Sequence, residues 1–232
     1  LNSLNIVISE IANTTCQGIN DGIITIEHNI NNPPYTYLWS NGAFTKNVMN
    51  LKAGEYSVTV TDANLCTASI SKIIVNDTPS LLSGIESIKH PTCHGMQNGF
   101  ISAIVQNGSG NYRFQWNTGD TTRLITNLPA GDYSLTVYDQ NGCESFLTTK
   151  LVAPDSIKVV PVSIEDVRCF GESNGSIKTN STGGTPPYTY LWTGIRTTDD
   201  IFNLAAGRYT LTVTDALGCR SIPLDVDVTQ PE

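Results

Sequence analysis

The sequence has little charge, no basic cluster and no long apolar run. Charged residues make up 15% of the 232 residues, and 13 basic against 21 acidic residues give a formal net charge of −8. Without a Lys/Arg patch the chain lacks the electrostatic footprint of phosphate-backbone binding, so we expect no nucleic-acid partner. No apolar run approaches the ~20 residues that cross a bilayer, so we expect no membrane insertion by this segment.

Targeting signals are also missing from the first residues. Residues 1–10 have neither the basic start nor the long apolar stretch of a signal peptide. We therefore expect the chain to be a segment of a longer protein whose targeting signals lie elsewhere.

The six cysteines recur at a fixed period. They stand at Cys16, Cys66, Cys93, Cys143, Cys169 and Cys219, so the first and second cysteine of each successive pair are always 50 positions apart. Six cysteines allow fifteen pairings in principle. Pairing across the connections would join Cys66 to Cys93 and Cys143 to Cys169, and would leave Cys16 and Cys219 unmatched. The constant spacing favours Cys16–Cys66, Cys93–Cys143 and Cys169–Cys219, one disulfide within each repeat.

Such disulfides indicate an oxidising, extracytoplasmic compartment. A loop of this size should contribute about 4 kcal/mol by restricting the unfolded chain. Zinc is the rival interpretation of paired cysteines, but there is no C-x-x-C and no histidine at a repeated position. We expect no metal and no cofactor.

Other residues keep step with the first cysteine of each pair, which indicates one structural unit used three times. They include Gly22/Gly99/Gly175, Trp39/Trp116/Trp192, Tyr56/Tyr133/Tyr209 and Asp62/Asp139/Asp215. Proline falls near the end of each unit, at Pro79, Pro154 and Pro231. We therefore predict three domains over residues 1–78, 79–153 and 154–232, joined by short connections.

Within each unit, apolar residues alternate with polar ones, as in half-buried strands. Strands are predicted at 5–8, 23–26, 35–39, 56–60 and 70–75 in the first unit, with counterparts in the others. Turn dipeptides such as Asn41-Gly42 and Asn141-Gly142 separate them. Six or seven short strands per unit predict an all-β chain of three tandem Ig-like β-sandwich domains.

The repeated aromatic residues are predicted to build the core of each sandwich. Trp39, Trp116 and Trp192 share a strand face with neighbouring tyrosines. Tyr56, Tyr133 and Tyr209 each follow an Ala-Gly turn, as in a tyrosine corner before strand F. A sugar-stacking platform is the alternative for these aromatic faces, but their shared register favours the core.

The remaining candidate sites have simpler explanations. Asp62, Asp139 and Asp215 could bind calcium, but each unit repeats only one such carboxylate, which favours a turn cap. His90 and His94 flank Cys93 without counterparts in the other units. No Gly-x-Ser-x-Gly and no repeated Ser/His/Asp order is present. We expect no catalytic residues and no enzyme activity.

Three motifs together resemble the SprB repeat. They are Cys-x-Gly-x-x-x-Gly-x-Ile at 169–177, Pro-Pro-Tyr-Thr-Tyr-Leu-Trp at 186–192, and a segment at 203–219 that ends in Gly-Cys. The resemblance extends over all three units, although the residues before the tryptophan strand differ between them. It implies large cell-surface adhesins of gliding and other Bacteroidetes bacteria, exported by the type IX secretion system, and it carries over no catalytic residues.

From this resemblance we expect a structural and adhesive stalk segment at the cell surface, involved in gliding motility and attachment. Its partners would be neighbouring repeats of the same chain and, through exposed faces, a surface polysaccharide or substratum. The alternative is a carbohydrate-binding or spacer module of a secreted polysaccharide-degrading enzyme.

Overall fold

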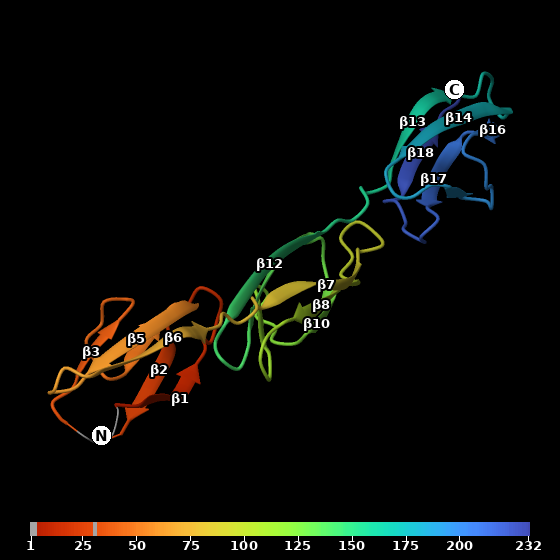
Figure 1. Ribbon diagram of the computed structural model, residues 1–232. Coiled ribbons are helices and arrows are strands. Elements are labelled where there is room, and N and C mark those ends of the chain that lie inside the picture. Colours follow the sequence, from red (N-terminus) through yellow and green to blue (C-terminus); the bar gives the residue numbers. More distant parts are fainter. Residues whose placement is uncertain (1–3, 30–31) are drawn as a thin grey trace. The chain divides into compact units, whose positions relative to one another are not determined.

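The computed structural model describes residues 4–29 and 32–232, and within them the regular structure consists of strands (Figure 1). The described residues contain no helix that is long and apolar enough to cross a membrane. The alternating apolar pattern explains the preference for strands, because one face of each strand is buried while the other faces solvent.

The strands fall into three sets of six, which we call repeats 1, 2 and 3. Repeat 1 contains β1 (Ile6–Ala12), β2 (Gly22–His28), β3 (Thr36–Trp39), β4 (Val48–Leu51), β5 (Gly54–Thr61) and β6 (Thr67–Val75). Repeat 2 contains β7 (Leu82–Lys89), β8 (Gly99–Gln106), β9 (Arg113–Trp116), β10 (Leu124–Leu128), β11 (Gly131–Tyr138) and β12 (Glu144–Leu151). Repeat 3 contains β13 (Lys158–Glu165), β14 (Ser173–Thr182), β15 (Thr189–Trp192), β16 (Ile201–Ala205), β17 (Gly207–Thr214) and β18 (Leu224–Val228).

Each repeat has two three-stranded sheets with the same strand order. In repeat 1 the sheets are β1-β2-β4 and β3-β5-β6, and repeats 2 and 3 follow the same scheme. In immunoglobulin notation these are strands A-B-E and C-F-G. The predicted all-β, Ig-like architecture is confirmed, while the disulfide predicted within each repeat is wrong, as shown below.

By their internal contacts, the residues form two compact units. The first comprises Leu1–Gly84, Ile104–Thr122 and Leu135–Leu147, and the second comprises Ile85–Ala103, Arg123–Ser134 and Thr148–Glu232. Repeat 2 contributes residues to both units. The domain boundaries near residues 78 and 153 stay a prediction.

Most strand positions agree with the alternation in the sequence, but the E strands were missed. The predicted strands at 23–26, 35–39, 56–60 and 70–75 lie on β2, β3, β5 and β6. Strands β4, β10 and β16 are short, and their buried side chains are three positions apart instead of alternating; in β4 they are Val48 and Leu51. Their register with strand B shifts at a bulge, so period two is lost.

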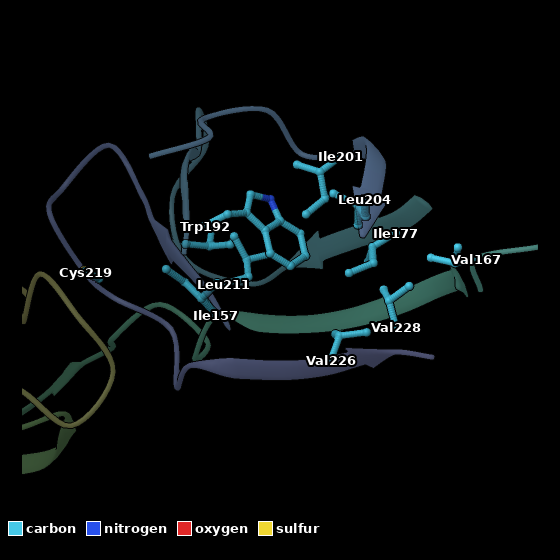
Figure 2. Close-up of a cluster of buried hydrophobic side chains, with 11 residues drawn as sticks. Ile157, Val167, Ile177, Trp192, Ile201, Leu204, Leu211, Cys219, Val226 and Val228 are labelled. Atoms are coloured by element: carbon cyan, nitrogen blue, oxygen red, sulfur yellow. The ribbon is translucent and has the colours of Figure 1, made fainter. Parts of the chain in front are cut away.

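A hydrophobic core lies between the two sheets in repeats 1 and 3. In repeat 3 the cluster joins Trp192 with Ile177, Ile201, Leu204, Leu211, Val226 and Val228, as Figure 2 shows. Repeat 1 has the equivalent cluster around Trp39. Each indole also donates its Nε1–H to a backbone carbonyl six residues later: Trp39 to Thr45, Trp116 to Thr122 and Trp192 to Thr198.

The repeated glycine at the start of strand B is required by close packing. A Cβ on Gly22 would lie 2.7 Å from Val75 Cγ1 and 3.0 Å from the Leu51 carbonyl oxygen. Gly99 and Gly175 have the same crowding, with Leu151 and Val228 in the place of Val75. The glycine allows strands B, E and G to converge at this end of the sandwich.

Candidate functional site: the disulfide-bearing turns

The turn between strands F and G is organised by one carboxylate in every repeat. In repeat 1, Asp62 Oδ1 accepts hydrogen bonds from the backbone N–H of Asn64 and Cys66, both at 2.9 Å. Its other oxygen, Oδ2, accepts from Asn32 in the loop between strands B and C, at 3.2 Å. Asp139 and Asp215 accept equivalent bonds from Asn141/Cys143/Ser109 and Leu217/Cys219/Thr185. The aspartate therefore fixes the second cysteine of each repeat and holds the F–G turn beside the B–C loop.

The turn between strands A and B presents the first cysteine. In repeat 1 the Cys16 carbonyl accepts from Ile19 N at 3.1 Å, and Gly18 between them has φ 77°. The residue before the cysteine, Thr15, donates its N–H to Asp21 Oδ1 at 3.0 Å. This turn immediately precedes β2, so it lies at the opposite end of strand B from the B–C loop.

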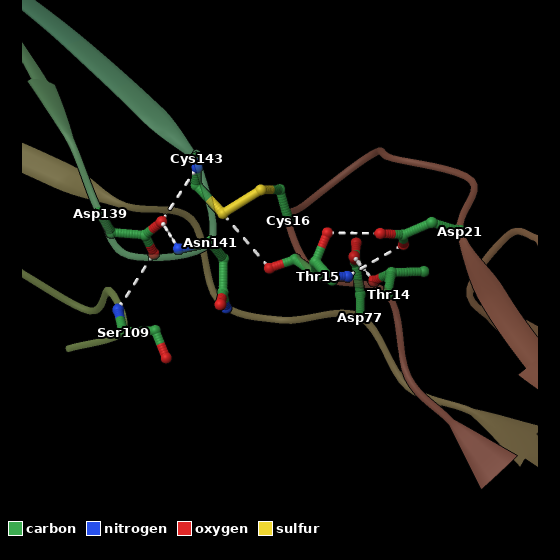
Figure 3. Close-up of a disulfide and its surroundings, with 9 residues drawn as sticks. All are labelled: Thr14, Thr15, Cys16, Asp21, Asp77, Ser109, Asp139, Asn141 and Cys143. Carbon is green, nitrogen blue, oxygen red and sulfur yellow. Dashed lines mark hydrogen bonds between the residues drawn. A yellow bond between two sulfur atoms is a disulfide. The ribbon is translucent and has the colours of Figure 1, made fainter.

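Two disulfides connect these turns between successive repeats (Figure 3). Cys16 of repeat 1 is bonded to Cys143 of repeat 2, with the Cα atoms 5.5 Å apart. Cys93 of repeat 2 is bonded to Cys219 of repeat 3, with the Cα atoms 5.6 Å apart. Each bonded sulfur of the F–G turn also lies near the carbonyl before its partner: Cys143 Sγ is 3.2 Å from Thr15 O, and Cys219 Sγ is 3.4 Å from Thr92 O. Cys66 and Cys169 are free and exposed.

The predicted pairs Cys16–Cys66, Cys93–Cys143 and Cys169–Cys219 are therefore wrong. The physical reason is the length of strand B, which separates the A–B turn from the F–G turn. β2 has 7 residues, which at about 3.3 Å per residue span roughly 23 Å. A disulfide needs Cα atoms about 4.4–6.8 Å apart. Within one repeat the two cysteines cannot meet, whereas the A–B turn of one repeat meets the F–G turn of the next.

Two of the turn aspartates, Asp62 and Asp215, have a lowered pKa. The N–H of Cys66 and the neighbouring donors hold the pKa of Asp62 below its usual value, against the opposing effect of burial. For Asp215, burial raises the pKa, but the backbone N–H groups of Thr185, Cys219 and Leu217 outweigh it and the net direction is downward. Both carboxylates therefore stabilise the folded turn more when they are ionised than when they are protonated.

This arrangement predicts acid sensitivity. Because the folded pKa of Asp215 lies below the unfolded one, its contribution is present above the unfolded value of about 3.9 and is lost as pH falls through the folded pKa. Asp215→Asn should cost about 1–3 kcal/mol at pH 7, since N–H groups lose their charged acceptor. It should also flatten the dependence of the melting temperature on pH below 4. Thermal melts at pH 7, 4 and 2.5 measure both effects.

Asp132→Asn is the matched control, because that carboxylate is 84% exposed. It should leave the melting temperature at pH 7 nearly unchanged. Equal losses in the two variants would contradict the role given to the turn aspartate.

The F–G turn of repeat 1 carries a strained residue. Leu65 has φ 65°, in the left-handed region, where repeats 2 and 3 have Gly142 and Gly218. Its side chain is 82% exposed, so no burial offsets the steric cost. Leu65→Gly should therefore raise the stability of repeat 1 by about 0.5–1 kcal/mol. Asn64→Gly, one residue earlier and without positive φ, should lower it. Urea denaturation of both variants tests this, and a loss of stability in Leu65→Gly would contradict it.

The repeated aromatic residues lie in the core and at the tyrosine corners. Trp39, Trp116 and Trp192 are each only 2% exposed, which leaves no indole face for a sugar. The phenol of Tyr56 donates to the Lys52 carbonyl at 2.9 Å, and Tyr133 and Tyr209 donate in the same way to Pro129 and Ala205. A tyrosine hydroxyl that donates to the backbone carbonyl four residues earlier is the contact that defines a tyrosine corner.

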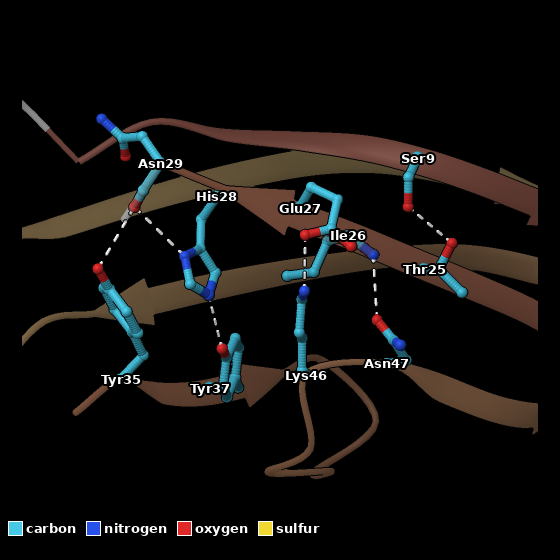
Figure 4. A network of polar contacts seen from close by, with 10 residues as sticks. All are labelled: Ser9, Thr25, Ile26, Glu27, His28, Asn29, Tyr35, Tyr37, Lys46 and Asn47. Atoms are coloured by element: carbon cyan, nitrogen blue, oxygen red, sulfur yellow. Dashed lines mark hydrogen bonds and ion pairs between the residues drawn. The ribbon is translucent and has the colours of Figure 1, made fainter. Parts of the chain in front are cut away.

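Repeat 1 also has a polar network centred on His28 (Figure 4). His28 on β2 contacts Tyr37 on β3, with Nε2 and Oη 2.9 Å apart, and its ring centroid lies 4.1 Å from that of Tyr35. Nearby, Lys46 forms an ion pair with Glu27 at 2.7 Å. The network links strands of the two sheets, since His28 lies on β2 and Tyr37 on β3. The positions equivalent to His28 in repeats 2 and 3 hold Val105 and Ser181. The residues that recur in all three repeats therefore give no indication of this network.

No group of three or more His, Cys, Asp or Glu side chains able to hold a metal occurs within residues 4–29 and 32–232. The repeated aspartates are instead turn caps, as the hydrogen bonds above show. Of the histidines near Cys93, His90 Nδ1 accepts from Val152 N at 3.2 Å. Cys93 itself is consumed in the bond to Cys219.

The model of the SprB repeat matches this chain three times, at residues 8–44, 85–121 and 162–197. Each match includes the A–B turn, its cysteine and the tryptophan strand of one repeat. The chain thus carries three SprB repeats.

Comparison with curated protein sequences found no significant match. Among solved structures, the chain is similar to Drosophila OTK extracellular domains 3–5 at 14% identity and TM-score 0.34, covering 100% of this chain and 98% of that one. It is also similar to the I-band fragment I67-I69 from titin at 10% identity and TM-score 0.38, covering 98% and 99%. The N-terminal eight Ig domains of Down Syndrome Cell Adhesion Molecule are similar at 12% identity and TM-score 0.44, covering 98% of this chain and 36% of that one.

Proposed function

We propose that this chain is a force-bearing stalk segment of a large bacterial cell-surface adhesin that takes part in surface attachment and gliding motility. The resemblance to the SprB repeat supports this proposal, because it implies a Bacteroidetes adhesin exported by the type IX secretion system. The observation that carries the proposal is the pair of disulfides that join successive repeats. Disulfides also suit an extracellular location.

The mechanical argument follows from the overlap of the two disulfide loops. The loop closed by Cys16–Cys143 and the loop closed by Cys93–Cys219 share residues 93–143. If every repeat unfolded under load, the shortest covalent path would run from Cys16 to Cys143, back along the chain to Cys93, and across to Cys219. This path limits the fully extended chain to about a third of its contour length, taking at most ~3.6 Å per residue.

Adhesion is assigned to surfaces outside the core. The three tryptophans are buried and their indole nitrogens are bonded to backbone carbonyls. Contact with a polysaccharide or substratum would thus use exposed side chains or other parts of the parent protein. The buried tryptophans weigh against the carbohydrate-binding module as the main role.

Single-molecule pulling between the two ends tests the mechanical role. With disulfides intact, the unfolded chain should stop at about a third of the length reached after reduction with dithiothreitol. Full extension without reduction would contradict the proposal. On cells that make the parent protein, an antibody against this chain should label intact cells and the label should disappear after surface proteolysis. Signal only after lysis would contradict the surface location.

A further inference from the structure

The two free cysteines lie in turns that have the same conformation as the bonded ones. In all three A–B turns the cysteine carbonyl accepts from the N–H three residues later, at 3.1 Å for Cys16 and 3.2 Å for both Cys93 and Cys169. The glycine between has φ 77°, 74° and 78° at Gly18, Gly95 and Gly171. The free Cys169 is therefore presented as the bonded Cys16 and Cys93 are.

The three F–G turns also share one conformation, whether their cysteine is bonded or free. The N–H of the turn aspartate donates to the cysteine carbonyl at 3.0 Å for Cys66, 3.0 Å for Cys143 and 2.9 Å for Cys219. The aspartate Oδ1 accepts from the cysteine N–H at 2.9 Å in each case. The free Cys66 therefore needs no rearrangement of its turn to take the place of Cys143 or Cys219.

Both observed disulfides run in the same direction along the chain. An A–B cysteine always bonds the F–G cysteine of the following repeat, as Cys16 does with Cys143 and Cys93 with Cys219. The residues left over are one F–G cysteine, Cys66, and one A–B cysteine, Cys169. We call the disulfide between an A–B turn and the F–G turn of the following repeat a joint. Cys66 is thus the F–G half of a joint, and Cys169 is the A–B half.

We propose that Cys66 and Cys169 are complementary bonding ends, and that Cys169 of one copy of this chain bonds Cys66 of the next to form a head-to-tail covalent array. This inference rests on the joint used in the proposed function and extends it beyond one chain. The partner of each free thiol is the matching cysteine turn of another SprB repeat, which a second copy of this chain supplies.

The side chains beside the two thiols support pairing between copies. Phe170 follows Cys169 and is 73% exposed, while Leu65 precedes Cys66 and is 82% exposed. At the two closed joints the corresponding positions hold Gln17 with Gly142 and His94 with Gly218. Only the proposed joint would thus bring together two large apolar side chains, and burying them would favour association.

The bond forms by thiol–disulfide exchange with an oxidant of the glutathione-disulfide class. The Cys169 thiolate attacks the oxidant and releases one glutathione, and the Cys66 thiolate of the second copy then displaces the other glutathione from the mixed disulfide. Overall, two thiols lose two protons and two electrons, and one glutathione disulfide becomes two glutathione molecules.

The test uses the whole purified chain in a buffer of reduced and oxidised glutathione. Non-reducing electrophoresis should show a ladder of dimers, trimers and longer species that collapses on reduction. Mass spectrometry of non-reduced peptides should find Cys66 linked to Cys169. A chain that stays monomeric, or a ladder without that linkage, would overturn the proposal.

Single variants test the direction of the bond. Cys66→Ser and Cys169→Ser each keep one half, so an equal mixture should give dimers and stop there. The mixture should yield at least about tenfold more dimer than either variant alone, the ratio that a preference of about 1.4 kcal/mol produces. Equal dimer from each variant alone would mean coupling of any exposed thiols and would overturn the proposal. Adding Phe170→Ala to Cys66→Ser should slow dimer formation in the mixture.

The same peptide map separates the two proposals. If Cys16–Cys143 and Cys93–Cys219 are found while Cys66–Cys169 is not, the head-to-tail array fails and the stalk stands. If the two internal bonds are missing as well, the basis of the stalk proposal also fails.

Discussion

Cys16→Ser should lower the free energy of unfolding by about 5 kcal/mol, whereas Cys66→Ser should leave it almost unchanged. The bond lost in the first variant closes a loop with a sequence separation of 127. Restricting a loop of that size lowers the entropy of the unfolded chain by an amount worth about 5 kcal/mol. Cys66 has no such bond and is exposed, so serine replaces it without loss.

Urea denaturation followed by tryptophan fluorescence measures this difference, with the wild type and Cys66→Ser as matched references. Non-reducing peptide maps should show Cys16 linked to Cys143 in both references. Pairing within each repeat makes the opposite prediction, because Cys16→Ser and Cys66→Ser would then break the same bond. Equal destabilisation by the two variants would contradict the bonds between repeats.

Trp192→Ala should destabilise repeat 3 by about 3–5 kcal/mol, the usual cost of removing a large aromatic side chain from a core. Trp192 is 2% exposed and belongs to the buried cluster of Figure 2. Its Nε1–H also donates to the Thr198 carbonyl at 3.0 Å. Alanine would leave a cavity between the sheets and leave that carbonyl without its donor.

Phe170→Ala is the control for aromatic content, because Phe170 is 73% exposed. It should change the unfolding midpoint by no more than about 0.5 kcal/mol in free energy. The destabilisation by Trp192→Phe should lie between those of Trp192→Ala and Phe170→Ala, because phenylalanine keeps part of the side-chain volume but lacks the indole N–H. A small effect of Trp192→Ala would mean that the indole is not a principal part of the core.

Much of the fold could be predicted from local patterns. Alternating apolar residues marked strands B, C, F and G, and the Tyr56 position indicated the corner that its bond to Lys52 O forms. The E strand at Val48–Leu51 was missed because its bulged pairing with strand B breaks the alternation. The role of Gly22 also needed the structure, since the contact that forbids a Cβ comes from Val75, far along the chain.

The cysteines separate what the sequence determined from what only the tertiary structure decided. By itself the sequence determined that one β-unit is used three times and that each copy presents two cysteines 50 positions apart. A constant spacing cannot tell a bond within a repeat from a bond between repeats, because separations of 127 and 126 repeat as regularly as 50 does. The choice depends on where the turns lie. Strand B carries the chain from the A–B turn to the B–C loop, and Asp62 holds the F–G turn beside that loop. The two cysteines of one repeat therefore stand at opposite ends of a sandwich, and each bonds a neighbouring repeat instead.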